Sequence, residues 1–114
     1  MLPRSARLHR GRDIARVSSQ GSRAHSGGIS VSVVVGDEPT ARATVVVSRR
    51  SGGAVARNRQ RRRIRHALVP TLQRVPAGAE LVVRGGPRVA QLPPAELASE
   101  LDRAVRRALR RVGS

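Results

Sequence analysis

Six of the nine residues from Arg57 to Arg65, in the stretch RNRQRRRIR, are arginine. A guanidinium group stays charged at neutral pH, and its planar fork can grip a phosphate with two hydrogen bonds at once. A merely solvated helix face would normally carry acidic side chains among the basic ones, yet none occurs between Glu38 and Glu80. The pattern favours a nucleic-acid partner, with a solvated or membrane-surface helix face as the weaker alternative.

The composition of the whole chain points the same way. All 23 basic residues are arginine, only seven acids oppose them, and the formal net charge is +16. Such a charge repels itself and attracts polyanions. Because Phe, Tyr and Trp are absent, bases cannot stack on the aromatic side chains that usually recognise single-stranded RNA. Contacts to backbone phosphates and stacking on arginine have to replace them.

Residues suited to catalysis or metal binding are scarce. The histidines His9, His25 and His66 lack the spacing of metal ligands, and surface or phosphate-contacting positions explain them better. The first 79 residues hold only three acids, which leaves little for a two-metal nuclease site or an acid and base pair. Cysteine is absent, which excludes disulfides and thiolate metal sites. We therefore predict that the polypeptide alone is not catalytic and binds no metal ion.

The length of 114 residues suits one compact domain. We predict a single domain over residues 1–114, with a loose N-terminal arm at residues 1–7. The first residues, MLPRSARLHRGR, contain no apolar signal-peptide region, and no apolar run approaches the roughly 20 residues that span a bilayer. The expectation is a cytoplasmic protein without membrane contact.

Hydrophobic periodicity indicates the elements that precede the basic segment. A first helix is predicted over about residues 10–20, with Gly21 as its C-terminal cap. ISVSVVV at 29–35 alternates like a half-buried strand. GDEPTA at 36–41 has the residues of a hairpin connection, so RATVVVS at 42–48 is predicted to return beside the first strand.

The basic segment itself is predicted to be a helix after the loop SRRSGG. Ile64 and Leu68 lie four residues apart and form part of an apolar stripe. Arg57 and Arg61 fall near the edge of that stripe on a helical wheel. Pro70 should kink or end the helix.

Two further elements complete the predicted fold. ELVVR at 80–84 is a short strand, and an amphipathic helix starts near Pro94 with its acids early and its arginines late, as the helix dipole favours. The order is α-β-β-α-β-α, with a possible extra strand in the early loops. An α+β fold, in which a small sheet packs with helices, is the simplest arrangement.

Residues 45–68, VVVSRRSGGAVARNRQRRRIRHAL, resemble the signature of the bacterial ribonuclease P protein component. The family pattern is a strand that ends in Ser and two basic residues, a Gly-rich turn, Ala-Val, and Arg-Asn-Arg with further basic residues on a helix. The order and length of the other predicted elements match the family over nearly the whole chain. The matching residues are Ser48, Arg49, Arg50, Gly52, Ala54, Val55, Arg57, Asn58, Arg59, Arg61, Arg62 and Arg65.

The resemblance implies a fold, an activity and two RNA partners. The fold is the ribonuclease P protein, or ribosomal S5 domain 2-like, fold with a left-handed βαβ crossover, which is rare. The protein would be the accessory subunit of an RNA-based endonuclease that removes 5′ leaders from precursor tRNAs. The catalytic centre and its Mg²⁺ ions would belong to the RNA subunit. The partners would be ribonuclease P RNA and precursor tRNA, and no protein partner is predicted.

The resemblance also implies two sets of binding residues. The single-stranded leader would lie in a cleft between the first helix and the sheet, where this chain has aliphatic residues in place of the family's aromatic ones. The candidates there are Ile14, Val17, Arg42 and Ser48. The basic helix and the preceding loop would grip the ribonuclease P RNA through Arg49, Arg50, Arg57, Asn58, Arg59, Arg61, Arg62 and Arg65.

Two other classes of protein would share these features. A structural RNA-binding protein of the ribosomal type, without a nuclease role, also combines basic loops with a small α+β core. A DNA-binding helix-turn-helix protein is the third possibility. Stimulation of a ribonuclease P RNA would distinguish a ribonuclease P protein from both of these alternatives.

Overall fold

The computed structural model describes residues 11–112, so the arm predicted at residues 1–7 lies outside the described part of the chain. The elements follow the order α-β-β-β-α-β-α, which is the predicted order with the extra strand present. They are α1 (Gly11–Gln20), β1 (Ser22–Ser26), β2 (Ile29–Val35), β3 (Arg42–Val47), α2 (Ala54–Leu72), β4 (Ala79–Gly85) and α3 (Pro94–Val112). Two short 3-10 helices, η2 (Arg49–Ser51) and η3 (Pro87–Gln91), precede α2 and α3.

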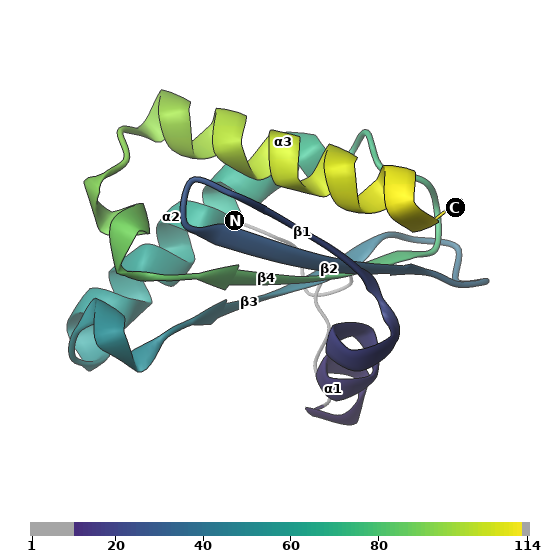
Figure 1. Cartoon of the computed structure of the whole chain (residues 1–114), viewed down its shortest axis with the longest axis horizontal. Helices are drawn as coiled ribbons and strands as arrows, with labels where there is room; N and C mark the ends of the chain where they lie inside the picture. Colours follow the sequence, from purple (N-terminus) through teal and green to yellow (C-terminus); the bar gives the residue numbers. More distant parts are fainter. Residues whose placement is uncertain (1–10, 113–114) are drawn as a thin grey trace.

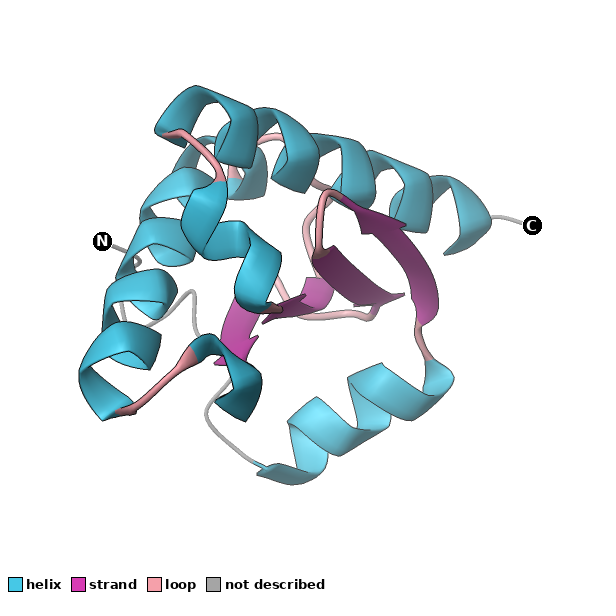
Figure 2. Ribbon diagram, turned by 60° about the vertical axis from the view of Figure 1, so that its left-hand side comes forward, coloured by secondary structure: helices cyan, strands magenta, loops and turns pink. Residues whose placement is uncertain are grey.

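The four strands form one mixed sheet in the order β1-β2-β4-β3 (Figure 1). β2 pairs antiparallel with β1 and β4, whereas β3 pairs parallel with β4. α1 packs on one face of the sheet, and α2 and α3 cover the other, as the two views in Figures 1 and 2 show. The architecture is the predicted α+β fold, a small sheet packed with helices.

Alternation along the strands divides the side chains between the two faces of the sheet. In β3, Ala43, Val45 and Val47 are buried in the main core, and the residues between them belong to the opposite face. Ile64 and Leu68 of α2 complete this core from the helical side. The arrangement places the basic helix on one face of the sheet and α1 on the other.

The predicted hairpin between residues 29–35 and 42–48 is wrong. β2 and β3 are not neighbours, because β4 lies between them. The strand at 79–85 is buried on both faces along almost its whole length, as a central strand requires. β2 instead forms a hairpin with β1 through Gly27 and Gly28, whose φ angles of 60° and 86° suit a tight two-residue turn.

The ends of the helices agree with the sequence, and of the two outcomes predicted for Pro70 only the kink stays a prediction. This proline does not end the basic helix, because α2 continues to Leu72. The final helix begins at Pro94 as predicted, and the strand predicted at 80–84 extends by one residue at each end. None of the helices in residues 11–112 is long and apolar enough to cross a membrane.

Gly21 closes α1, as predicted, and also permits a close approach to the sheet. Its N–H donates to the carbonyl of Val17 at 2.9 Å. A Cβ at this position would lie 2.5 Å from that carbonyl oxygen and 2.8 Å from the carbonyl oxygen of Val33. Glycine is therefore required here by lack of space, and the close contact sets where α1 lies on the sheet.

Candidate nucleic-acid interface

A narrow stripe of side chains holds α2 to the rest of the protein. Gln60, Ile64, Leu68 and Thr71 are buried, three or four residues apart. The helix packs with this stripe against β3 and α3. The arginines lie on the remaining sides of α2, and its first turn contains no acid. The stripe thus determines which way a strongly basic helix faces.

Two arginines on the solvent side of α2 are available to a partner. Arg59 and Arg62 are exposed, and neither makes a hydrogen bond or an ion pair with any residue that the structure describes. Val55 lies on the same side of the helix and is 76% exposed. Like charges three residues apart repel each other, so an anion bound at this side would relieve an unfavourable interaction.

The predicted residues Arg57, Asn58, Arg61 and Arg65 lie along one flank of α2. Arg61 donates to Oδ1 of Asn58 at 2.6 Å. Arg57, Arg61 and Arg65 are half-buried, and the buried Nε of Arg57 has no hydrogen-bond partner. The half-buried state of Arg57 and Arg61 agrees with the edge positions predicted for them.

That loop, which joins β3 to α2, carries the other two predicted arginines. Arg49 and Arg50 are exposed in η2. Gly52 has a φ of 121°, a conformation that glycine adopts readily and other residues rarely do. The hydroxyl oxygens of Ser48 and Ser51 are buried without a hydrogen-bond partner. The loop therefore presents cations next to polar groups that the fold leaves unsatisfied.

The N-terminus of α2 adjoins the same loop. Its N-cap residue, Gly53, provides no side-chain cap. The first N–H groups of a helix have no intrahelical acceptor and lie at the positive end of the helix dipole. Together with the loop arginines, these groups can bind phosphate oxygens. The exposed arginines and the uncapped helix end are chemically suited to an anionic partner.

Arg63 differs from its neighbours because it makes structural contacts. It donates to Oε1 of Gln60 at 3.0 Å, to the carbonyl of Val89 at 2.9 Å and to the carbonyl of Leu92. These bonds fasten α2 to η3 and to the residues before α3. Arg63 is not one of the predicted RNA-binding residues. Its structural role could not be predicted from the sequence, because its residue type is the same as that of its neighbours.

The residues predicted for a leader cleft all belong to the α1 side of the sheet. Val17 of α1 is 0% exposed and packs against Val82 of β4, with Val34 and Val46 beside them. Ile14 is half-buried at the edge of this small second core. Val17 therefore joins α1 to the sheet and is covered, whereas Ile14 keeps part of its surface accessible.

Arg42 and Ser48 lie at opposite ends of β3. Arg42 pairs with Glu80 at the start of the strand, and the N–H of Ser48 donates to the carbonyl of Gly85 at 3.0 Å just beyond its end. Ser48 lies six residues after Arg42 along extended chain, which corresponds to about 20 Å. The structure thus places the four leader candidates on one face without gathering them at one point.

Sequence reasoning missed Arg84, which belongs to the same face. Its Nη2 donates to Oγ of Ser18 in α1 at 2.7 Å, and its side chain is half-buried. Strict alternation in β4 puts Glu80, Val82 and Arg84 on one side of the strand. That alternation was the available signal, but the short apolar run conceals it.

Almost the whole sequence matches one protein family. A family model described as ribonuclease P matches residues 2–109. The chain belongs to the ribonuclease P protein family. The ribonuclease P protein component of Acidothermus cellulolyticus is 42% identical over 109 residues, which cover 94% of this chain and 91% of that protein. The corresponding protein of Streptomyces bikiniensis is 37% identical, with 96% of each chain covered.

Solved structures of ribonuclease P proteins share the fold. The protein from Staphylococcus aureus has a TM-score of 0.77 at 18% identity, covering 90% of this chain and 94% of that one. The protein from Thermotoga maritima has a TM-score of 0.75 at 20% identity, covering 91% and 96%. These likenesses confirm the predicted ribonuclease P protein fold. The handedness of the crossover from β3 through α2 to β4 stays a prediction.

Proposed function

We propose that this ribonuclease P protein binds the catalytic ribonuclease P RNA and the 5′ leader of precursor tRNA, and so assists endonucleolytic removal of the leader. The contact with the ribonuclease P RNA is assigned to the eight basic-segment residues of α2 and its preceding loop. The leader is assigned to the α1 side of the sheet. Both RNA partners meet the protein in the cytoplasm, where tRNA processing takes place.

The observation that carries this proposal is the pair Arg59 and Arg62. Both side chains are exposed and without partners among the described residues, and the loop at one end of their helix holds buried polar atoms without hydrogen bonds. A phosphate backbone would provide acceptors for these donors, which have none in the part of the protein that the structure describes. Binding here positions the protein on RNA through its phosphates.

The magnesium ions of the reaction are assigned to the RNA subunit. Among the side chains that the structure describes, no three His, Asp or Glu groups lie close enough together to hold a metal ion. The protein's own contribution is positive charge. Arginines that neutralise crowded phosphates reduce the number of cations that the RNA must take from solution.

On the leader side, the contacts must differ from stacking on aromatic rings, since the chain has none of Phe, Tyr or Trp. The α1 side offers Ile14 as an apolar surface and Arg42 and Arg84 as half-buried cations. Both arginines already contact protein groups, so a leader phosphate would share them. A leader bound this way would be held by its backbone more than by its bases.

Reconstitution tests the proposal directly. The purified chain is combined with a bacterial ribonuclease P RNA, and cleavage of a precursor tRNA is followed at magnesium concentrations where the RNA alone is slow. We expect the chain to restore cleavage under these conditions. A structural RNA-binding protein of the ribosomal type would bind the RNA without restoring cleavage, and that outcome would sink the proposal in favour of the alternative.

A charge-matched pair of variants makes the test specific. R59A/R62A removes two exposed arginines three residues apart from α2, and R103A/R106A removes two exposed arginines with the same spacing from α3. Arg103 and Arg106 pair with acids on their own helix. The α2 variant should lose most of the stimulation and the α3 variant little. Equal losses would show that net charge alone is responsible.

A further inference from the structure

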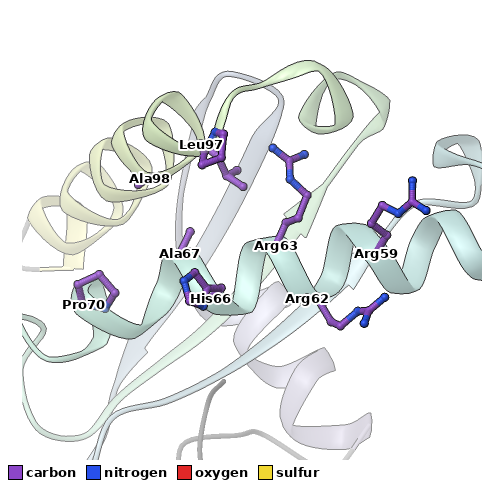
Figure 3. Close-up of a pocket in the computed structure, with 9 residues that line it drawn as sticks. Arg59, Arg62, Arg63, His66, Ala67, Pro70, Leu97 and Ala98 are labelled. Carbon is purple, nitrogen blue, oxygen red and sulfur yellow. The ribbon is translucent and has the colours of Figure 1, made fainter.

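An open groove of about 650 Å³ runs between α2 and the first turns of α3 (Figure 3). Its sides contain Ala67 and Pro70 from α2 and Pro94, Leu97 and Ala98 from α3. The two alanines and two prolines among these residues are short and fill little of the space between the helices. The volume lies within the range of about 300–1,000 Å³ that is typical of small-ligand sites.

Basic side chains from α2 form one rim of this groove. Arg59, Arg62, Arg63 and His66 line it, and none of its nine lining residues is acidic. Arg63 points toward α3 and the segment before it, where its hydrogen bonds hold it (Figure 3). Arg59 and Arg62 have no such partners in the described part of the chain. The groove thus combines an apolar floor with cations that can still bind an anion.

We infer that this groove holds a single unstacked nucleotide of a bound RNA, with the base on the apolar floor and its phosphate on Arg59 and Arg62. His66 is exposed at the rim. Its planar ring provides a surface on which the base can stack, in a chain that has no Phe, Tyr or Trp. A base outside its stack needs such a slot, because it otherwise exposes its faces to water.

The position of the groove favours RNA over an acidic peptide as the occupant. Arg59 and Arg62 belong both to the groove and to the surface assigned to the ribonuclease P RNA, so the two are continuous. The inference therefore rests on the proposed function, because it requires that an RNA binds along α2. An RNA held on α2 by its backbone would bring its bases beside the groove, and one extruded base would then fix the register of the RNA along the helix.

Nucleotide binding by the full chain tests this inference. Adenosine 5′-monophosphate, ribose 5-phosphate and inorganic phosphate are titrated separately into isotope-labelled protein, and the NMR signals of the Ala67 and Ala98 methyl groups are followed. We expect the nucleotide to bind about tenfold more tightly than ribose 5-phosphate, which corresponds to one stacked base. Equal affinity for all three would show a phosphate site without a base pocket and would overturn the inference.

Two alanines of α3 provide a matched pair of variants. Ala98 lines the groove, whereas Ala95 is exposed on the same helix and does not line it. A98L should fill the groove and weaken nucleotide binding about tenfold, while A95L should leave it unchanged. H66A, which truncates an exposed side chain, tests the base contact if A98L fails to fold. Nucleotide affinity unchanged in both A98L and H66A would place the binding elsewhere and contradict the inference.

The remaining outcomes separate the inference from the proposed function. Binding of a short acidic peptide with one leucine in the groove, without binding of the nucleotide, would overturn the RNA assignment. If the chain restores precursor tRNA cleavage but does not bind the nucleotide at Ala98, only this inference fails. If it binds the nucleotide there but does not restore cleavage, only the proposed function fails.

Discussion

Arg42 donates a hydrogen bond to Oε1 of Glu80, 3.2 Å away, between the paired parallel strands β3 and β4. Arg16 of α1 donates to the other oxygen of the same carboxylate. Glu80 is 4% exposed, and no other acid occurs between residues 39 and 95. One buried carboxylate therefore joins β3, β4 and α1, and it does so in the most acid-poor part of a strongly basic chain.

The first prediction concerns the charge on Glu80. E80Q keeps the shape of the side chain but leaves two arginines around a neutral amide. We expect the free energy of unfolding to fall by about 1–3 kcal/mol, toward the lower end because water reaches both arginines. Urea unfolding measures it. E38Q, which removes the charge of an exposed loop acid, is the control, and equal midpoints for the two variants would contradict the prediction.

The second prediction concerns the space at Gly21. G21A should destabilise the protein by about 2 kcal/mol or more, because its Cβ has no room between the carbonyls of Val17 and Val33. G53A is the comparison, since a Cβ there meets no atom within 4 Å. It should change stability by less than about 1 kcal/mol. Thermal unfolding of both variants checks the prediction, and a similar loss in both would count against it.

The third prediction concerns the salt dependence of RNA binding. Each phosphate contact that is lost lowers the slope of log K against log salt concentration by about 0.7–0.9. R59A/R62A should therefore flatten the slope for ribonuclease P RNA by about 1.4–1.8. Filter binding over a range of salt concentrations measures it. R103A/R106A should leave the slope nearly unchanged, and parallel lines for wild type and R59A/R62A would remove these residues from the interface.

The fourth prediction separates two adjacent arginines. R63A removes the donor to the carbonyls of Val89 and Leu92, so it should lower the free energy of unfolding by about 1–3 kcal/mol. R62A should change stability by less than about 0.5 kcal/mol, because the side chain is exposed, yet it should weaken RNA binding. Chemical denaturation and RNA titration of both variants test this. Identical profiles for the two would contradict the assigned roles.

The long elements could be predicted because their sequences carry strong local patterns. The apolar stripe of α2 around Ile64 and Leu68 and the start of α3 at Pro94 agree with the structure. β1 was only a possible extra strand, because SRAHS has one buried apolar residue, Ala24, and no clear alternation of apolar side chains. β1 forms a strand because its backbone pairs with β2, and this pairing is not visible in the local sequence.

Strand neighbours and individual arginine roles depend on distant contacts. Residues 36–41 look like a hairpin connection, yet β4 inserts between β2 and β3 because its run of Leu81, Val82 and Val83 needs cover on both faces. Arg62 and Arg63 are adjacent and chemically identical. Only the approach of η3 to one side of α2 makes one of them a structural residue.

Along the chain, α2 follows β3 and precedes β4, and this order affects the kinetics of folding. β3 and β4 are parallel neighbours, so they can pair only after the intervening chain has crossed the sheet. That chain is the arginine helix, whose like charges repel one another as the helix forms. Closing the loop that brings β3 to β4 is therefore the step that polyanions should accelerate most. If RNA binds this helix as proposed, RNA that is already present would therefore speed the folding of the protein.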